Sequence, residues 1–423
     1  MSLTEKDSQY LWHPYTQHKT ASAPIAITKG KGALLWDEND KEYIDAIASW
    51  WVNPYGHSNS FIAEAIYKQL TTLEHVLFGG FTHEPAVVLA EKLMAILPKN
   101  QQKLFFSDNG STAVEIAIKV ALQYFFNKGE KKTTIIAFEN AFHGDTFAAM
   151  AASGISLFTD AFQGMFIDVV RIPVPIVGEE KASCDALAKA IKDHNCAGFI
   201  YEPLVQGAAG MVMYEPAALD ALIRMCKDNN VLTIADEVMT GFGKTGRTFA
   251  SDYLEEQPDM MCLSKALTGG TIPMAITTFT QEIFEAFYDE DINKALFHGH
   301  TFTANPTGCA AALASLELLQ TPEMQSNISR VNANHLAFQK RIQTHSKVVT
   351  TRVLGVIFAL EIKTESAASY YGNLRNKLYS FFIENGVILR PVGNVVYILP
   401  PYIITDEQLE KVYQVVESAL EIV

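Results

Sequence analysis

The feature that most constrains the fold is a long alternation of strand-like and helix-like segments between about residues 50 and 311. Short apolar runs such as TTIIAF, AGFIYEP, VLTIADE and DMMCLS are bounded by polar turns, and helical periodicity, as in STAVEIAIKVALQYF, lies between them. Strands that are separated by helices pair in parallel, and a parallel sheet is buried on both faces. The pattern therefore predicts an α/β fold around a large, mostly parallel sheet.

The two ends of the chain depart from this alternation. The beginning has the turn signals GKG and ENDK between apolar runs, as in a small hairpin. The end combines strand-like runs with the helical segment ITDEQLEKVYQVVESALEI. We expect residues 50–311 to form the large α/β domain, and residues 1–49 and 312–423 to build a smaller α+β domain together.

Charge and cysteine content exclude several classes of protein. The net charge of −14 comes without a cluster of Lys and Arg, which argues against a nucleic-acid-binding protein. The five cysteines form no C-x-x-C pair, so neither a disulfide scaffold nor a common zinc site is expected. The sequence begins without a signal-peptide pattern and has no apolar run of the ~18 residues that a membrane span needs. We expect a cytoplasmic enzyme that contacts no membrane.

Two charged residues follow buried strands. Lys265 follows the apolar run of Met260 to Leu263 after one residue, Ser264, and Asp236 ends the run VLTIAD. A desolvated lysine has a lowered pKa and can form a Schiff base with a carbonyl compound. Because carboxyl ends of parallel strands meet at one crevice, Asp236 and Lys265 can share a site. Pyridoxal phosphate needs such a pair: a lysine for its aldehyde and an acid for its ring nitrogen. The alternatives are a lysine that extends to water and a purely structural ion pair.

A third segment is suited to an anion. In FFSDNGSTAVEIAIK, a strand leads through Asn109, Gly110 and Ser111 into an amphipathic helix. Free N–H groups and the helix dipole favour a phosphate at such a helix start. Simple capping of the helix is the alternative, since Ser, Thr and Asn are preferred caps.

Two further motifs have plain explanations. GFGKTG, from Gly241 to Gly246, matches the dinucleotide pattern G-x-G-x-x-G and would make the chain a nicotinamide dehydrogenase. The residues after it do not continue as an apolar-faced helix, so we interpret it as a turn. His143 has no partner in the sequence pattern, and the His298–His300 pair has no third ligand at a metal-binding spacing, so no metal is predicted.

Taken in order, NGSTAVE, FHGDTFAAM, EPLVQGAAGM, ADEV-x-TGFG, SKALTGG and HGHTFTANP resemble the class III aminotransferases, which are pyridoxal 5′-phosphate enzymes of fold type I. The resemblance runs over almost the whole chain. It implies that Lys265 is the Schiff-base lysine and Asp236 the partner of the ring nitrogen. It also implies a homodimer whose two active sites lie at the subunit interface.

The remaining cofactor contacts follow from the same resemblance. It implies that Asn109, Gly110 and Ser111 bind the cofactor phosphate. It also implies that Phe142 stacks on one face of the cofactor ring and that Val238 packs on the other. From the neighbouring subunit, the turn of Gly299, His300 and Thr301 would reach the phosphate.

The flanking motifs WHPYTQH, ASWWVNPYGHSN and RPVGNVVYILPPY resemble a branch of this family that acts in biotin biosynthesis. In that branch S-adenosylmethionine donates an amino group to 8-amino-7-oxononanoate, in a ping-pong reaction. The resemblance implies a substrate pocket lined by Tyr15, Trp50, Trp51 and Tyr397, with Arg390 holding the substrate carboxylate. Such roles suit the flat apolar face of Trp and the planar fork of Arg.

The sequence departs from the pattern of the family at two positions. Phe142 stands where most members have Tyr, so the ring is kept but the hydroxyl associated with S-adenosylmethionine is lost. Lysine, the donor in a related branch, is therefore an alternative, as is another class III reaction on an ω-amine. His300 stands where proline is more usual, which should be tolerated if the backbone and Thr301 make the contact.

Overall fold

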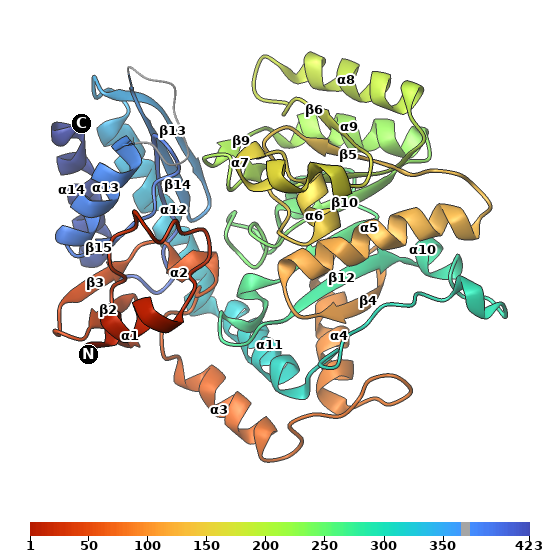
Figure 1. The fold of residues 1–423 in the computed structure, drawn as a ribbon, viewed down its shortest axis with the longest axis horizontal. Coiled ribbons are helices and arrows are strands. Elements are labelled where there is room, and N and C mark those ends of the chain that lie inside the picture. Colours follow the sequence, from red (N-terminus) through yellow and green to blue (C-terminus); the bar gives the residue numbers. More distant parts are fainter. Residues whose placement is uncertain (365–372) are drawn as a thin grey trace.

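A computed structural model describes residues 1–364 and 373–423 of the chain. Its largest element is a seven-stranded sheet in the order β4-β12-β11-β10-β7-β5-β6 (Figure 1). The strands are β4 (Gln101–Ser107), β5 (Thr134–Phe138), β6 (Val169–Ile172), β7 (Cys196–Tyr201), β10 (Leu232–Asp236), β11 (Met260–Leu263) and β12 (Ala275–Thr280). The predicted α/β fold with a mostly parallel sheet is confirmed, because β12 alone runs antiparallel to its neighbours in this sheet.

The alternation of side chains along the strands explains why this sheet is buried on both faces. In β5, Ile136 and Phe138 belong to one apolar cluster, and Ile135 and Ala137 belong to another on the opposite face. Helix α5 (Gly110–Asn127) packs against β11, β12 and β7 on the second face. The other helices of this part are α3 (Ser60–Leu70), α4 (Glu84–Ile96), α6 (Phe147–Ala152), α7 (Ser156–Thr159), α8 (Glu180–Asp193), α9 (Pro216–Asp228), α10 (Gln281–Glu285) and α11 (Pro306–Leu319).

Strand β12 is the element of this sheet that the sequence pattern did not predict. Its run AITTFT contains three threonines, and yet Thr277 and Thr278 are fully buried. Their hydroxyls donate to Ala113 O at 2.8 Å and to Gln101 Oε1 at 2.7 Å. Because these hydrogen bonds lie inside the protein, hydroxyl groups are accommodated in a core strand that looks half-polar in the sequence.

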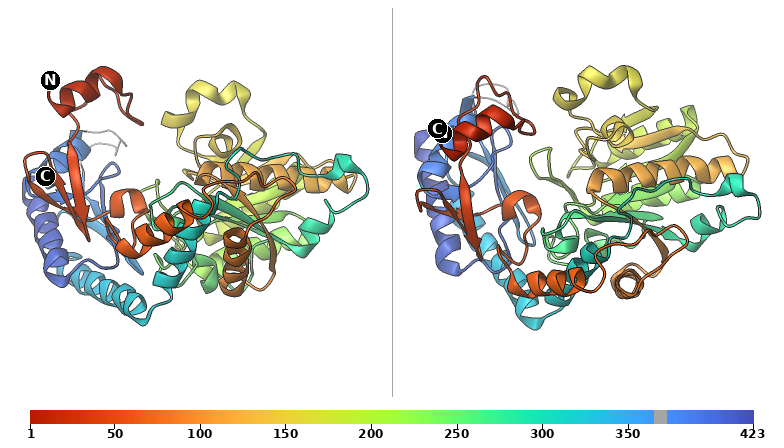
Figure 2. Two further views of the ribbon diagram at one scale, coloured as in Figure 1. Left: turned by 90° about the horizontal axis from the view of Figure 1, so that it is seen from below. Right: turned by 60° about the horizontal axis from the view of Figure 1, so that its bottom comes forward.

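The two ends of the chain meet in a second sheet, β1-β2-β3-β15. Val387 and Ile388 of β15 pair in parallel with Ile44 and Asp45 of β3, so the first and last parts of the chain lie side by side (Figures 1 and 2). The strands are β1 (Ile27–Lys31), β2 (Leu34–Asp37), β3 (Glu42–Asp45) and β15 (Val387–Ile388). The predicted domains 1–49, 50–311 and 312–423 stay predictions. Helix α11 spans the predicted boundary between residues 311 and 312.

A third sheet and several helices complete this smaller part. The sheet has the order β13-β14-β16, with β13 (Val348–Leu354), β14 (Ile357–Ile362) and β16 (Val395–Ile398). The helices are α1 (Leu3–Tyr10), the short α2 (Ala48–Trp51), α12 (Pro322–Ile342), α13 (Asn373–Glu384) and α14 (Asp406–Ile422). A two-stranded ribbon, β8 (Val205–Gln206) with β9 (Val212–Met213), follows β7.

The GFGKTG segment forms a buried turn where the two parts of the chain meet. The backbone N–H of Val356 donates to Lys244 O at 2.9 Å, and Tyr402 Oη donates to Phe242 O at 2.7 Å. A Cβ atom on Gly355 would lie 2.2 Å from the backbone nitrogen of Gly246, so only glycine allows the β13–β14 hairpin to approach this closely. The turn joins the large and small parts of the molecule.

No helix in the described ranges is both long and apolar enough for a membrane span. Within the same ranges, no group of three or more His, Cys, Asp and Glu side chains could hold a metal ion.

Candidate active site

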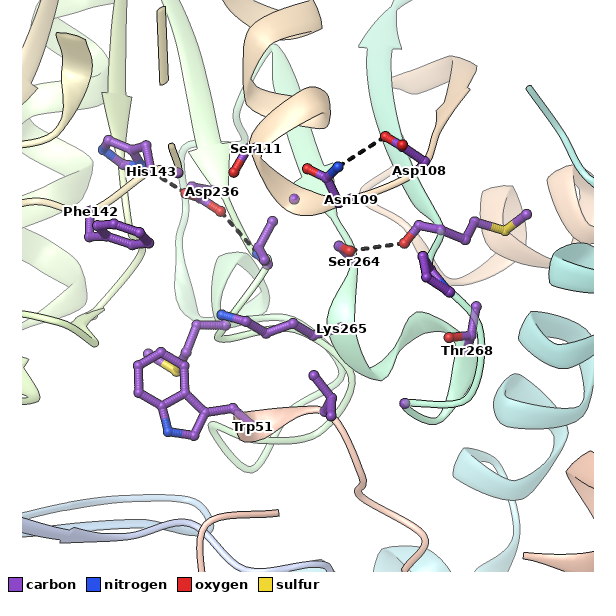
Figure 3. A pocket seen from close by; sticks show the side chains of 18 of the residues that line it. Trp51, Asp108, Asn109, Ser111, Phe142, His143, Asp236, Ser264, Lys265 and Thr268 are labelled. Carbon is purple, nitrogen blue, oxygen red and sulfur yellow. Dashed lines mark hydrogen bonds and ion pairs between the residues drawn. The ribbon is translucent and has the colours of Figure 1, made fainter. Parts of the chain in front are cut away.

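Asp236 and Lys265 meet at the carboxyl edge of the large sheet. Asp236 is the last residue of β10 and is paired in register with Cys262 of β11, and Lys265 follows β11 after one residue. Both line a cavity of about 580 Å³, within the ~300–1,000 Å³ usual for small-molecule sites. The structure thus brings together the two residues that the sequence pattern assigned to one crevice (Figure 3).

The side chain of Lys265 extends over the ring of Trp51 towards Asp236 and Phe142 (Figure 3). Its Nζ atom lies 4.6 Å from the centre of the Trp51 ring. Desolvation lowers the pKa of Lys265 to about 8, although the charges of Asp236 and Glu202 act in the opposite direction. The amine therefore loses its proton far more easily than an exposed lysine does.

A buried histidine holds the Asp236 carboxylate. His143 Nδ1 lies 2.8 Å from Asp236 Oδ2, and the other oxygen, Oδ1, accepts the backbone N–H of Val238 at 3.1 Å. The expectation that His143 lacks a partner was wrong, because the partner lies 93 residues away in sequence and only the fold brings it near. With the Nδ1–H donating, the histidine fixes the direction in which the carboxylate faces the cavity.

Glu202 is a residue of the cavity that the sequence reasoning did not single out. It is 4% exposed, its Oε1 accepts the backbone N–H of Phe142 at 3.1 Å, and its Oε2 accepts that of Gly207 at 2.9 Å. Desolvation raises its pKa to about 7; His143 lowers the pKa and Asp236 raises it further. The sequence did contain a signal for this residue. Glu202 and the proline after it follow the apolar run AGFIY, and a carboxylate at the end of a strand lies at the edge of the sheet where sites form.

The start of α5 combines a helix cap with an anion cradle. Asn109 is the N-cap: its Oδ1 accepts the N–H of Thr112 at 3.1 Å, and Thr112 Oγ1 accepts the N–H of Asn109 at 3.2 Å. The carboxamide of Asn109 is therefore engaged in capping. The N–H groups of Gly110 and Ser111 belong to the first helical turn, where N–H groups have no partner within the helix. They leave the helix start open to a phosphate.

Two close approaches shape this cradle. A Cβ atom on Gly110 would lie 2.7 Å from Val238 Cγ1, and one on Gly144 would lie 2.2 Å from Ser111 Oγ. Both glycines let neighbouring segments close around the helix start. A helix start for a phosphate, a carboxylate for a ring nitrogen, and a lysine for an aldehyde lie around one cavity. These residues fit pyridoxal 5′-phosphate, with Phe142 and Val238 both lining the same cavity.

An aromatic wall extends from this cavity into the small part of the molecule. The Trp51 ring contacts the Tyr397 ring at a centroid distance of 5.8 Å, and the Trp50 ring contacts the Tyr15 ring at 5.6 Å. Arg390 Cζ lies 4.4 Å from the centre of the Trp50 ring, and this guanidinium makes no ion pair within the described part of the chain. Of the five residues assigned to the substrate pocket, Trp51 lines the cavity and contacts Lys265. The other four continue the wall, with Tyr397 against Trp51, and Tyr15 and Arg390 against Trp50.

The turn of Gly299, His300 and Thr301 lies apart from the lining of this cavity. It belongs to the segment before α11, where the N–H of His300 donates to Thr303 Oγ1 at 3.0 Å. His298 contacts Lys119 Nζ at 3.1 Å through its Nδ1. A contact between this turn and a phosphate would have to be made across a subunit interface, so its assigned role stays a prediction.

Comparison with known proteins agrees with this geometry. The family model of class III aminotransferases matches residues 15–420. The adenosylmethionine-8-amino-7-oxononanoate aminotransferase of Synechococcus elongatus is 43% identical over 420 residues, covering 97% of this chain and 98% of that protein.

Solved structures agree as well. The enzyme of the same name from Methanocaldococcus jannaschii superposes with a TM-score of 0.94 at 34% identity, covering 99% of this chain and 98% of that one. An amine transaminase from an uncultivated Pseudomonas species, solved in its PLP-bound form, superposes with a TM-score of 0.89 at 26% identity, covering 97% and 98% of the two chains.

Proposed function

Since the chain belongs to the class III aminotransferases, we propose that it transfers an amino group from S-adenosylmethionine to 8-amino-7-oxononanoate in biotin biosynthesis. The product is 7,8-diaminononanoate. The reaction proceeds in two half-reactions, the first with the donor and the second with the acceptor. The aromatic wall, with Lys265 Nζ over Trp51 and the Arg390 guanidinium over the neighbouring Trp50, is the observation that carries this proposal.

Pyridoxal 5′-phosphate is the cofactor of the family, and when bound it draws electrons away from the carbon that carries the amino group. The residues of this chain would hold and orient that group. Gly110 and Ser111 would receive its phosphate, and Asp236 would present a carboxylate to its ring nitrogen. His143 donates to that carboxylate at 2.8 Å, which would keep it directed at the ring nitrogen when the cofactor is bound.

Lys265 moves the proton at its Nζ atom. A general acid–base group works best when its pKa is close to the working pH, because it then both accepts and releases a proton readily. The pKa of Lys265 is lowered to about 8 by desolvation, so Nζ is able to take a proton from the substrate carbon and return it. Trp51 covers one side of this amine and limits its access to water.

The acceptor is a nine-carbon carboxylic acid that carries its amino and oxo groups at the far end of an alkyl chain. Its alkyl chain would lie along Trp50 and Trp51, and its carboxylate would be bound by Arg390. A short-chain substrate, such as 4-aminobutyrate or ornithine, has less alkyl chain to lie along the two indoles.

An acceptor screen tests the proposal. The loaded enzyme in its amino form is mixed with 8-amino-7-oxononanoate, and separately with succinate semialdehyde and glutamate semialdehyde, and cofactor absorbance is followed. We expect return of the aldehyde absorbance with 8-amino-7-oxononanoate at low concentrations. Faster turnover with either semialdehyde would assign the protein to an ω-amine reaction instead.

The donor is tested in the other half-reaction. Phe142 offers a ring without a hydroxyl to the cavity, and this favours lysine as a second candidate donor. The enzyme in its aldehyde form is mixed with S-adenosylmethionine or with lysine, and formation of the amino form is followed by absorbance. We expect conversion with S-adenosylmethionine. Conversion with lysine alone would replace the donor while leaving the acceptor assignment intact.

We also propose that the protein acts as a homodimer. Two loops expose large apolar side chains: Leu77 and Phe81 on one, Phe297 and Phe302 on the other, each more than half exposed. The loops contact each other, because the rings of His75 and Phe302 lie 5.3 Å apart. Such a patch marks a protein–protein surface, and the second loop carries Gly299, His300 and Thr301. Phe302→Glu is expected to shift the sedimentation of the enzyme from dimer to monomer and to abolish turnover. A monomeric native enzyme would contradict the proposal.

The proposed location is the cytoplasm. Four cysteine side chains, Cys196, Cys226, Cys262 and Cys309, are packed in the core as thiols, which suits a reducing compartment. Fractionation of cells that produce the protein, followed by immunoblotting, tests this. Recovery in a membrane or periplasmic fraction would contradict it.

A further inference from the structure

The short helix α2, which carries Trp50 and Trp51, has an unusual backbone. Three of its four residues have positive φ: Ala48 at 48°, Ser49 at 63° and Trp51 at 66°. Ser49, with ψ of −72°, is close to the γ-turn of the rare and strained type. None of these residues is glycine, so the strain must be offset by contacts around the turn.

The indole of Trp51 does not supply such a contact. Its Nε1 atom is buried and has no hydrogen-bond partner within the described residues. The ring packs in the apolar core beside Gly207 and contacts the Tyr397 ring and Lys265 Nζ, and these contacts have little directionality. The directional contacts of the turn are therefore those made to its backbone.

Asp45, at the end of β3, makes the contacts that fix the turn. It is fully buried, and its Oδ2 atom accepts the backbone N–H of Ser49 at 2.7 Å and the Ser49 hydroxyl at 3.4 Å. Its Oδ1 atom accepts the N–H of Ile47 at 3.2 Å. One carboxylate thus binds the backbone on both sides of Ala48, where the chain enters its strained conformation.

His57 and Asn53 complete the network. His57 Nε2 lies 2.8 Å from Asp45 Oδ2, and His57 Nδ1 lies 3.2 Å from Asn53 Nδ2. Because the Asn53 amide donates, Nδ1 accepts, and the imidazole carries its proton on Nε2, directed at Asp45. Asn53 Nδ2 also lies 3.3 Å from Ser49 Oγ. The Asn53 oxygen fills the space where a Cβ atom on Gly270 would be, only 2.0 Å away, and Gly270 lines the catalytic cavity.

We propose that Asp45, supported by His57, is the positioning residue for the two tryptophans of the substrate wall. The carboxylate holds α2 in its strained conformation, so that Trp51 lies beneath Lys265 Nζ and Trp50 beneath the Arg390 guanidinium. Loss of the carboxylate lets the turn relax and separates the two rings from these cations. The inference rests on the proposed function, because it treats the tryptophans as the wall for the acceptor chain.

Asp45→Asn tests the proposal, and Asp37→Asn is its matched control. Asp37 is also buried in the same sheet and also accepts two backbone N–H groups, from Asn39 at 2.9 Å and Lys41 at 3.0 Å, and one side-chain donor, the Tyr43 hydroxyl at 3.0 Å. It caps the β2–β3 turn, away from the tryptophans. An amide at either position places an N–H group against an existing donor.

Three quantities are measured on the loaded enzymes: kcat and KM for 8-amino-7-oxononanoate, the near-ultraviolet circular dichroism of the indoles, and the temperature of unfolding. For Asp45→Asn we expect KM for the acceptor to rise at least tenfold and the indole bands to weaken. For Asp37→Asn we expect a lowered unfolding temperature with KM within twofold of wild type. Equal KM values for Asp45→Asn and wild type, or equal rises in both variants, would overturn the proposal.

A rescue experiment isolates the strain. Glycine adopts the φ of Ser49 without penalty. Ser49→Gly in the Asp45→Asn background should therefore restore the indole dichroism and lower KM for the acceptor part of the way to the wild-type value. A double variant no better than Asp45→Asn would overturn the role assigned to strain. If Asp45→Asn does not fold, His57→Gln takes its place in each comparison, with a smaller expected rise in KM.

These readouts separate the inference from the proposed function. If wild type fails to use 8-amino-7-oxononanoate, the proposed function is wrong. The dichroism of Asp45→Asn, Asp37→Asn and the double variant then still decides whether Asp45 holds the tryptophans, because it is measured without acceptor.

Discussion

Arg390 offers the sharpest test of how the acceptor is recognised. Its guanidinium stacks on Trp50 with Cζ 4.4 Å from the ring centre, and the side chain is half-buried. Arg390→Met keeps an unbranched alkyl chain against the indole and removes the charge. A hydrogen bond to a charged group contributes about 1.5–3 kcal/mol. One such bond to the carboxylate therefore corresponds to a loss of about 10- to 100-fold in kcat/KM for the acceptor.

The assay compares two acceptors in both enzymes. One is 8-amino-7-oxononanoate, and the other is its neutral primary amide, which has the same length but no carboxylate charge. Wild type is expected to prefer the acid by about 10- to 100-fold, and Arg390→Met to show a preference of less than about threefold, since the variant has lost the one bond worth about 1.5–3 kcal/mol. A variant that keeps the full preference for the acid would refute the assignment of Arg390, because another group would then bind the carboxylate.

Three further outcomes are expected. Lys265→Ala should abolish measurable turnover with an unchanged far-ultraviolet circular dichroism spectrum, since a positioned acid–base group is worth about 10²–10⁴-fold; appreciable activity without an added amine would contradict its role. In cofactor-free protein, the Lys265 amine has a folded pKa of about 8 against an ordinary 10.5, so the unfolded chain binds more protons between these values. Denaturant titrations should therefore show the free energy of unfolding of wild type rising with pH over this window relative to Lys265→Met, and a flat difference would contradict the lowered pKa. Gly355→Ala places a Cβ atom 2.2 Å from the Gly246 nitrogen at a φ of 58°, and should lower the free energy of unfolding by at least about 2 kcal/mol. In the control Gly129→Ala, the residue has a φ of 75° but its Cβ atom would have no neighbour within 4 Å, so this variant should lose less free energy of unfolding. Equal losses of free energy in the two variants would contradict the close contact at Gly355.

The two central residues of the site were predictable from the sequence because each lies at the end of a mostly apolar run. Such a run predicts a buried strand, and its carboxyl end predicts the position of the next charged residue. Lys265 and Asp236 could therefore be placed at one edge from spacing alone. Their assignment to a cofactor needed the resemblance to a family, since a structural ion pair has the same sequence pattern.

The supporting residues were not predictable in this way. His143 and Asp236 are 93 residues apart, and Glu202 and Phe142 are 60 apart, so their contacts depend on the completed sheet. Strand β12 was missed because its threonine hydroxyls look polar in sequence and are satisfied only inside the fold. The backbone of α2 gave no signal either, since its positive φ values fall on Ala48, Ser49 and Trp51 and not on glycine.

The pairing of β3 with β15 has a consequence for the order in which the molecule assembles. Every strand of the large sheet lies between Gln101 and Thr280, so the edge with Asp236 and Lys265 needs no later segment for its strand pairing. The sheet that supports α2 lacks one strand until β15 has been synthesised, and Lys41 Nζ donates to Ile383 O across 342 residues. During synthesis, domains form as their segments become available. The growing chain thus makes every strand of the large sheet first, and the sheet that supports the two tryptophans is complete only after the segment with β15 has been made.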